Sequence, residues 1–294
     1  MKTEIIKEFD IDKIKEEKDA TLVLGLFDGI HKGHQFLIKE ALKNNDNVII
    51  LSLLKSFKNN EDVLLSLEDK EEILSSFNIK KLILLDNSLY FKNMTYLDFI
   101  LKILKIINPK NIYVGSDYTF GKNGLGNVSI LKKYFKVFTP NFYLVNNEKV
   151  SSTKIKEYIR NGEVEKANYM LNRYYFYKGT VIKGLQNGSK FLFPTINLSL
   201  LTNYVLLKNG VYQTQITIDG LIYNSITNIG VHPTIDKLSS PSIETFVLNF
   251  NKEVYEKNIK LEFIRFIREE KKFSSIEQLK QQILQDISNC GLKF

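Results

Sequence analysis

Two of the chain's three histidines lie in one glycine-rich segment, Gly25-Leu-Phe-Asp-Gly-Ile-His31-Lys-Gly-His34. An apolar run at 21–24 precedes this segment and a helical pattern at 35–42 follows it, so we predict a turn that joins a strand to a helix. Backbone N–H groups at a helix start bind anions, and glycines let the chain approach a phosphate closely. Imidazoles can donate hydrogen bonds to phosphate oxygens as charge develops on them. The segment therefore indicates nucleotide binding with phosphoryl or nucleotidyl transfer.

The same segment has a plainer interpretation, a tightly packed turn with solvent-exposed histidines. A single glycine or a single histidine would favour that interpretation. Here three glycines and two histidines occur within ten residues, and this combination favours a functional turn.

The composition allows about two folded domains. Of the 294 residues, 44% are hydrophobic and 12% are aromatic, which suffices for sizeable packed cores. The chain has 41 Lys+Arg against 33 Asp+Glu, a net charge of +8. Such a mild excess suits polyanionic ligands such as nucleotides and does not by itself indicate a nucleic-acid partner. Lysines such as Lys102 and Lys105 fit solvated helix faces.

Cysteine usage and the N-terminus point to a reduced compartment. Cys290 is the only cysteine, so neither an intrachain disulfide nor a cysteine-based zinc cluster can form. The charged segment 1–19 lacks the apolar core of a signal peptide, and no apolar run in the sequence is long enough to span a bilayer. We expect a cytoplasmic protein with no membrane partner.

Strand-like and helix-like segments alternate in the first half. Strands are predicted at 21–26, 47–54, 81–85, 111–115 and 141–145, and helices at 35–43, 67–78, 96–107 and 128–136. The second helix opens with the capping pattern Ser66-Leu-Glu-Asp69. Alternation of this kind predicts an α/β fold with a parallel, doubly wound sheet. Ligands of such sheets lie outside the carboxyl ends of the strands, where the Gly25 turn and the segment Gly115-Ser-Asp-Tyr-Thr-Phe-Gly121 both fall.

The pattern changes in the second half. Helices are predicted at 150–160, capped by serine and threonine residues, and at 163–171. Strands are predicted at 178–182, 210–218, 221–228, 244–250 and 259–267, with a final amphipathic helix at 275–287. Asn-Gly and Asp-Gly pairs mark hairpin turns, so we expect an antiparallel barrel covered by that helix. The domain limits are predicted at 1–172 and 173–294.

These motifs together resemble the bifunctional riboflavin kinase/FMN adenylyltransferases, the bacterial FAD synthetases. In the first half the resemblance rests on Gly25 to His34, Val114-Gly-Ser-Asp-Tyr-Thr-Phe-Gly121 and Val150-Ser-Ser-Thr153. In the second half it rests on Phe193-Pro-Thr-Ile-Asn197, Asn209-Gly-Val-Tyr212, Asn228-Ile-Gly-Val-His-Pro-Thr234, Glu244-Thr245 and Ile267-Arg-Glu-Glu-Lys-Lys-Phe273. The first motif alone recurs across many nucleotidyltransferases, whereas the ordered set is specific.

The resemblance implies two reactions in sequence. The C-terminal barrel domain is expected to phosphorylate riboflavin with ATP, giving FMN. The N-terminal Rossmann-like nucleotidyltransferase domain is expected to transfer AMP from a second ATP to FMN, giving FAD and pyrophosphate. Mg²⁺ is the implied cofactor and ATP the co-substrate; riboflavin, FMN, FAD and ATP are the implied ligands, with no nucleic acid.

The resemblance also implies roles for residues of the barrel domain. Glu244 aligns with the catalytic glutamate, which would take the proton of the riboflavin 5′-hydroxyl. Thr195 and Asn197 align with residues at the Mg²⁺–ATP site, where neutral oxygens suit magnesium. The remaining residues that the resemblance places in ligand binding here are Gly184, Gly188, Lys190, Asn228 and Arg268. An outward strand carboxylate at Glu244 and turn chemistry after Pro194 are the alternatives.

In the first half, attack by the FMN phosphate on the α-phosphorus of ATP needs no base, so positioning and charge stabilisation should dominate. His31 and His34 are the implied catalytic residues at the ATP phosphates. Asp28 has a structural turn role as an equal alternative. The residues implied in nucleotide or flavin binding are Gly25, Phe27, Asp28, Gly33, Asp117, Ser151, Ser152, Thr153 and Lys156.

The chain departs from the family pattern at identifiable positions. Lys156 stands where the family has arginine, which keeps the charge but loses the bidentate fork that grips phosphate. The segment 51–57 lacks the family's proline and histidine, and Phe246 replaces a histidine two residues after Glu244. These changes motivate one alternative, a riboflavin kinase with a degenerate adenylyltransferase domain. A non-catalytic flavin- or RNA-binding protein is the distant alternative; another nucleotidyltransferase would leave Glu244 and residues 194–197 unexplained.

Overall fold

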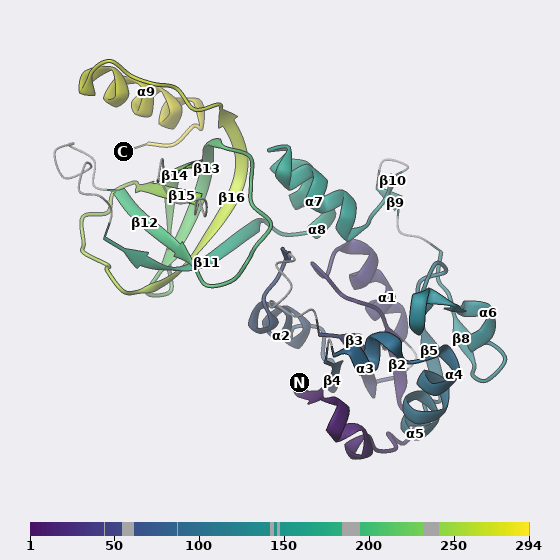
Figure 1. The fold of residues 1–294 in the computed structure, drawn as a ribbon. Coiled ribbons are helices and arrows are strands. Elements are labelled where there is room, and N and C mark those ends of the chain that lie inside the picture. The colour runs from purple at the N-terminus through teal and green to yellow at the C-terminus, as the bar shows by residue number, and fades with distance from the viewer. Residues whose placement is uncertain are drawn as a thin grey trace. The chain divides into compact units, whose positions relative to one another are not determined.

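The computed structural model describes residues 1–43, 45–54, 62–86, 88–141, 144–145, 148–183, 195–231 and 241–293. By its contacts the chain divides into two compact units, Met1–Ser152 and Thr153–Phe294. Figure 1 shows a sheet with surrounding helices in the first unit and a barrel in the second. The domain limits at 172/173 remain a prediction about where each activity ends.

A six-stranded parallel sheet forms the centre of the first unit. Its strands in spatial order are β1 (Lys2–Ile6), β4 (Lys81–Leu85), β3 (Val48–Leu53), β2 (Thr21–Leu24), β5 (Asn111–Tyr113) and β8 (Val137–Phe138). From β2 the chain builds outward first through β3 and β4, and then on the other side through β5 and β8. The strand order therefore reverses between β2 and β5, and this is the switch point at which open α/β sheets bind ligands.

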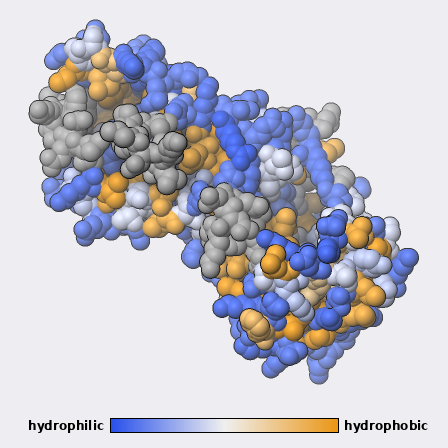
Figure 2. Space-filling view, in the orientation of Figure 1, coloured by the Kyte–Doolittle hydropathy of each residue, from blue (hydrophilic) through white to orange (hydrophobic). Residues whose placement is uncertain are grey.

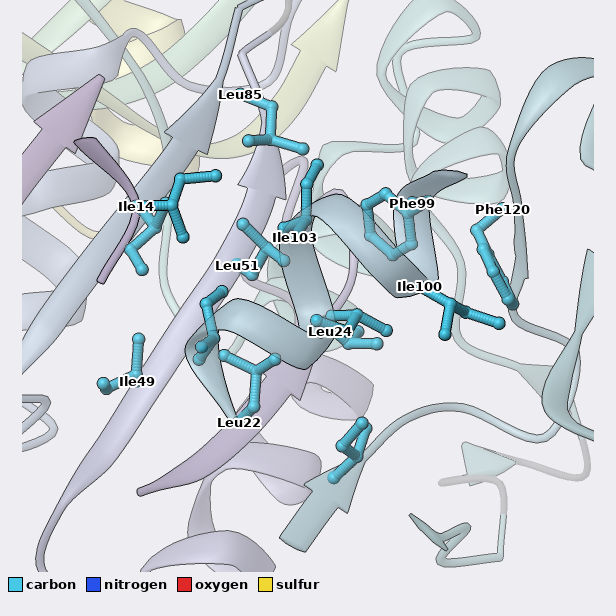
Figure 3. Packing of buried hydrophobic residues seen from close by; sticks show 14 of the residues in the cluster. Ile14, Leu22, Leu24, Ile49, Leu51, Leu85, Phe99, Ile100, Ile103 and Phe120 are labelled. Carbon is cyan, nitrogen blue, oxygen red and sulfur yellow. The ribbon is translucent and has the colours of Figure 1, made fainter. Parts of the chain in front are cut away.

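The inner strands β2, β3 and β4 are buried because they are nearly continuous apolar runs, as is typical of parallel sheets. Leu22 and Leu24 of β2, with Ile49 and Leu51 of β3, belong to one buried cluster with Ile103. Figure 3 shows these side chains gathered between the strands and the helical segment that carries Ile103. The helical segments of this unit are α1 (Lys32–Leu42), α2 (Leu67–Ser75), α3 (Leu89–Asn93), α4 (Tyr96–Phe99), a π-helical stretch (Ile100–Leu104), α5 (Lys105–Ile107), α6 (Val128–Leu131) and the 3-10 turns Glu8–Lys13 and Lys122–Gly124.

Several local predictions for this unit agree with the structure. Strand β4 has the predicted bounds, and α2 begins after the predicted cap. Ser66 Oγ accepts a hydrogen bond from Asp69 N at 3.1 Å, and Ser66 N donates to Asp69 Oδ2 at 3.1 Å. This reciprocal pair satisfies two N–H groups that the start of a helix leaves without partners.

The strand predicted at 141–145 is wrong as a member of the sheet. The edge position beside β5 belongs to β8, where Phe138 stacks on Tyr113 with ring centroids 4.9 Å apart. Strand β9 (Leu144–Val145) instead pairs antiparallel with β10 (Glu148–Lys149). Strand β1 was not predicted, because its alternating charges resemble a solvated segment; Glu4 there forms an ion pair with Lys81 of β4. A small antiparallel pair joins β6 (Thr119–Phe120) to β7 (Gly126–Asn127).

A closed six-stranded antiparallel barrel forms the second unit. Its strands in spatial order are β11 (Tyr175–Ile182), β12 (Thr195–Leu200), β15 (Pro241–Val247), β14 (Leu221–Val231), β13 (Gly210–Ile218) and β16 (Asn258–Arg268). Helices α7 (Ser152–Arg160) and α8 (Val164–Leu171) precede the barrel, and α9 (Ile276–Asn289) follows it. The predicted fold class, a parallel α/β domain with an antiparallel barrel and a C-terminal helix, is confirmed. Strand β12 was not predicted as a strand.

The two faces of the barrel wall have different chemistry. Aromatic side chains fill the interior, where the ring centroids of Tyr212 and Phe263 lie 5.6 Å apart. The buried hydroxyls of Thr214, Thr227 and Thr245 form a hydrogen-bonded chain across β13, β14 and β15. On the outer face α9 packs Ile287 against an apolar cluster of Val211, Ile226, Phe246 and Leu248. Alternate residues of β15 therefore point inward and outward, so that Thr245 is interior and Glu244 is exterior.

The visible surface mixes polar and apolar residues on both units (Figure 2). Within the described ranges, the helices fall short of the length and apolarity that crossing a bilayer requires.

Candidate active sites

The turn between β2 and α1 has a strained backbone. Phe27 (φ +50°) and Ile30 (φ +41°) adopt left-handed conformations although neither is a glycine, and both side chains are fully buried. Each such residue costs about 1–3 kcal/mol and persists only where its surroundings hold it. Strain of this kind occurs at functional sites, so the turn predicted from sequence stands out in the structure as well.

Hydrogen bonds from other elements hold this turn in place. They run from Ser52 Oγ and Lys70 Nζ to Leu26 O (3.0 and 3.1 Å), from Ser152 Oγ to Asp28 O (2.6 Å), from Leu64 N to Asp28 Oδ1 (3.2 Å) and from Gln35 Nε2 to Ile30 O (2.8 Å). The buried Asp28 carboxylate thus has a structural partner. The bond from Ser152 Oγ to Asp28 O brings Ser152 to the glycine-rich turn, although the two residues are 124 positions apart.

The two histidines of the turn stack on each other. Their ring centroids are 3.7 Å apart, and His31 Nδ1 accepts the backbone N–H of His34 at 3.3 Å. In a neutral His31 the proton is therefore on Nε2, so this atom is the donor of the ring. At Gly33 a Cβ would lie 3.2 Å from the His31 ring, so the glycine gives that ring its space.

His34 is a neutral imidazole near physiological pH. Burial, followed by the nearby His31 and Lys70, holds its pKa well below 6.5. Its Nδ1 atom is buried and has no hydrogen-bond partner among the described residues. A buried ring nitrogen left unsatisfied in a strained turn is a group that a ligand can engage.

The other predicted residues of this half lie in two places, after strand β5 and at the start of helix α7. Asp117 follows β5 and is more than half exposed; its carboxylate forms an ion pair with Lys149 of β10. Ser151 lies just before α7, and Thr153 and Lys156 lie on that helix, Thr153 exposed and Lys156 half-buried. The contacts of Thr153 and Lys156 place them in the second unit.

A cavity of about 340 Å³ opens at the carboxyl ends of β2 and β3. Gly25 and Ser52 line it together with aromatic residues Phe91, Phe99, Tyr118 and Phe120. The Tyr118 and Phe120 rings are stacked with centroids 5.9 Å apart, and burial raises the pKa of the Tyr118 hydroxyl, which is therefore protonated. Sequence reasoning did not single out these aromatic residues; their alternation after β5 was the available signal.

In the barrel, the strand register brings three predicted residues side by side. Glu244 of β15 lies directly opposite Asn197 of β12 on one side and Asn228 of β14 on the other. Glu244 is half-buried, and its Oε1 accepts a hydrogen bond from Ser242 Oγ at 3.1 Å. Thr195 is two residues before Asn197, so it shares the outer face of the wall.

A second carboxylate, which sequence reasoning missed, lies beside this row. Glu270 Oε1 accepts a hydrogen bond from Asn228 Nδ2 at 3.1 Å. A Cβ on Gly230 would come within 2.5 Å of the same oxygen, so the glycine leaves the room that Glu270 occupies. Glu270 falls within the 267–273 motif, which was the signal available.

Arg268 is engaged with the C-terminal helix. Its guanidinium donates to both carboxylate oxygens of Asp286 at 2.9–3.1 Å, and Asp286 is 1% exposed. Gln282 Nε2 donates to the same carboxylate at 2.9 Å. This arrangement fastens α9 to the end of β16. A ligand-binding role for Arg268 stays a prediction, and it would have to be compatible with this ion pair.

Three predicted residues of the barrel, Gly184, Gly188 and Lys190, lie outside the described residues, as do residues 55–57 of the first unit. Among the residues that are described, no cluster of three or more histidine, cysteine or acidic side chains is placed to hold a metal. The oxygens of Thr195 and Asn197 form a sparser set, of the kind that magnesium uses when phosphates supply its other ligands.

Comparisons with known proteins match each half separately. A riboflavin kinase family model matches residues 171–293, and an FAD synthetase family model matches residues 13–158. Bifunctional riboflavin kinase/FMN adenylyltransferases from Bacillus subtilis and Listeria monocytogenes are 32% and 30% identical to this chain. These alignments cover 93% and 94% of this chain and 92% and 91% of the relatives.

A solved structure shares the whole fold. A Streptococcus pneumoniae protein described as a macrolide-efflux protein superposes with a TM-score of 0.90 at 29% identity, over 98% of both chains. This likeness concerns the fold, whereas the family assignment rests on the two family models and the curated relatives. With both matches spanning the residues of the two sites, the chain belongs to the bifunctional riboflavin kinase/FMN adenylyltransferase family.

Proposed function

We propose that this protein makes FAD from riboflavin in two ATP-dependent steps. The barrel unit phosphorylates riboflavin to FMN, and the parallel-sheet unit adenylylates FMN to FAD with release of pyrophosphate. The observation that carries the proposal is that each family match falls on a separate group of site residues: the Asn197–Glu244–Asn228 row in the barrel and the strained His31–His34 turn beside the sheet.

In the kinase step, the riboflavin 5′-hydroxyl oxygen attacks the γ-phosphorus of ATP, and ADP leaves. Glu244 orients this hydroxyl and takes its proton, which then passes to solvent. The bond from Ser242 leaves the second Glu244 oxygen to face the substrate. The flanking asparagines on both sides fix the carboxylate at one point of the wall, because strand register allows little sideways movement.

The oxygens of Thr195 and Asn197 are the groups that would hold Mg²⁺ with the ATP phosphates. When bound, Mg²⁺ neutralises charge on those phosphates. The position of Asn197 opposite Glu244 supports this assignment, since it places the metal-binding oxygens beside the base.

In the adenylylation step, an FMN phosphate oxygen attacks the α-phosphorus of ATP, and the bond to the β-phosphate breaks. The nucleophile is already ionised, so no base is needed and charge stabilisation dominates. His31 Nε2 and the unpartnered His34 Nδ1 are the groups that would contact phosphate oxygens. The hydroxyl of Ser151, at the start of α7, supplies a further donor for the leaving pyrophosphate.

The aromatic cavity supports a flavin site in this unit. An isoalloxazine ring is flat and largely apolar, and aromatic walls bind such rings by stacking. Gly25 lines the cavity and also opens the histidine turn, so a flavin in the cavity would have its phosphate next to the nucleotide site.

Separate assays of the two steps test the proposal. Purified protein is incubated with ATP, Mg²⁺ and either riboflavin or FMN, and the flavins are separated by chromatography. Glu244→Gln should reduce FMN formation by about 10²–10⁴-fold and leave FAD formation from FMN unchanged. His31→Ala should do the reverse. Glu253→Gln, an exposed carboxylate of the same barrel, is the matched control for the first change.

Unchanged riboflavin in the wild-type reaction would refute both activities. FMN without FAD, even at high FMN and ATP, would favour the kinase-only alternative that Lys156 motivates. Intact kinase turnover in Glu244→Gln would show that Glu244 is not the base.

A further inference from the structure

Lys70 is a lysine buried beside the strained turn, and none of the sequence motifs includes it. It lies on α2 and is 7% exposed. A lysine side chain loses the hydration of its charge when buried, so its ammonium group must be compensated by close partners. One partner is the carbonyl oxygen of Leu26 in the turn, 3.1 Å from Lys70 Nζ. The same oxygen accepts a hydrogen bond from Ser52 Oγ.

The position of Lys70 on its helix explains how it reaches the turn. Lys70 is four residues before the buried Leu74, so both lie on the face of α2 that packs inward. The capping box at Ser66 and Asp69 fixes the first turn of this helix. The lysine thus enters the site from a rigid element and across 44 positions of sequence.

The ammonium group of Lys70 also lies close enough to His34 to act on it. Together with burial and the stacked His31, its positive charge opposes protonation of His34 and lowers the pKa of that imidazole. Among the described residues, these are the charged or titratable groups that act on His34, and the apolar ring of Phe27 lies 4.9 Å away between centroids. The result is a neutral ring with an unpartnered buried nitrogen, backed by a fixed cation.

We propose that Lys70 is a positioning residue of the adenylyltransferase site. It holds Leu26 O, and so the backbone of the turn, and it brings an ammonium group to the turn that carries the His31–His34 pair, where a triphosphate would bind. The proposal rests on the proposed adenylylation of FMN. A bound triphosphate brings several negative charges, and a cation already in place stabilises them without reorganisation.

Kinetics of the full-length protein test this role. Lys70→Met keeps the length of the side chain but removes its charge, and we expect kcat/KM for ATP in the FMN-to-FAD step to fall by about 100-fold. Lys70→Arg keeps the charge and should recover most of that loss. Lys39→Met removes one charge from an exposed position of the same unit and should leave kcat/KM for ATP unchanged. The kinase step, whose residues lie in the other unit, measures the amount of intact barrel, and urea unfolding followed by circular dichroism checks the fold of the unit that carries Lys70.

A histidine titration by NMR adds a readout that does not need turnover. The chain has only three histidines, so each signal can be assigned with single substitutions. In Lys70→Met the pKa of His34 should rise, and the acid limb of the pH–rate profile should move to higher pH. In Lys70→Arg both should stay as in the wild type. If Lys70 acted only by holding the backbone of the turn, neither the pKa of His34 nor the acid limb of the pH–rate profile would change in Lys70→Met.

Two results would overturn the proposal: FAD formation in Lys70→Met at the wild-type rate, or equal losses in Lys70→Met and Lys70→Arg with an unchanged His34 titration. If the wild type itself forms no FAD, the adenylyltransferase assignment fails. The titration, repeated with and without ATP, then still decides whether Lys70 sets the state of His34 and its response to nucleotide.

Discussion

The two candidate sites are built by different means. The site beside the parallel sheet depends on one strained turn, which hydrogen bonds from distant elements hold in place. The barrel site depends on strand register, which sets Asn197, Glu244 and Asn228 in a row. Because single bonds anchor its turn, the first site should be sensitive to the loss of any one of them. The second should fail mainly when the barrel wall itself is destabilised.

The largest expected effect comes from breaking the ion pair that fastens α9 to the barrel. Asp286→Ala leaves the mostly buried Arg268 guanidinium without its carboxylate. Removing one partner of a buried pair costs about 3–5 kcal/mol, a large part of the stability of a typical domain. We expect the barrel unit to unfold at much lower urea concentration by circular dichroism, with loss of kinase activity.

The matched control is Asp219→Ala, which removes an exposed pair with Lys257 and should cost less than about 1 kcal/mol. Conversion of FMN to FAD should survive in both variants. Unchanged unfolding of Asp286→Ala would show that α9 does not support the barrel.

A smaller effect is expected from removing one anchor of the strained turn. Ser152→Ala leaves Asp28 O without the hydroxyl that now donates to it. The loss is about 1–2 kcal/mol, and because it falls on the turn we expect a roughly tenfold drop in kcat/KM for FAD formation. Ser75→Ala removes a comparable but exposed bond to Glu72 O and should leave the rate unchanged. If Ser152→Ala and Ser75→Ala gave the same kcat/KM for FAD formation, the hydrogen bond from Ser152 would have no role in catalysis.

The pH dependence of stability should distinguish the histidine site. The pKa of His34 is lowered in the folded protein, so below 6.5 the unfolded chain binds a proton that the folded chain does not. Its contribution to stability is therefore complete above pH 6.5 and is lost as pH falls below that value, by up to about 1.4 kcal/mol per pH unit. In urea unfolding, His34→Gln should remove this part of the pH dependence. An identical decline between pH 6.5 and 5.5 in both proteins would contradict the assignment.

The smallest effect concerns a departure from the family pattern. Lys156→Arg introduces a guanidinium group, which can bind phosphate through two hydrogen bonds at once; from the proposed role of this position in phosphate binding, we expect KM for ATP in the FAD step to fall by about twofold to fivefold. Lys154→Arg on the same helix, where the lysine pairs with Glu157, should have no effect. A higher KM in Lys156→Arg would mean that the site is adapted to lysine.

Most of the correct fold predictions came from local sequence patterns. Three predicted features agree with the structure because they depend on periodicity or on a hydrogen bond between near neighbours, which a sequence shows directly. They are the strand at Lys81–Leu85, the strand at Gly210–Ile218 and the cap at Ser66. The edge strand was predicted at 141–145 instead of Val137–Phe138, because a short exposed strand has little hydrophobic periodicity. Its position depends on a contact between Phe138 and the ring of Tyr113 on the neighbouring strand. The histidine turn was predicted from its glycines and histidines, and Glu244 through the resemblance to the family; the roles of both stay predictions.

The sequence by itself determined that a glycine-rich turn with two histidines follows a buried strand, and that an antiparallel barrel carrying Glu244 comes later in the chain. Only the tertiary structure decided that Lys70 stands behind the turn, that Glu270 occupies the space left by Gly230, and that Arg268 pairs with Asp286. The physical reason is distance along the chain. Such contacts depend on helix packing and strand register, which join residues that no local pattern relates.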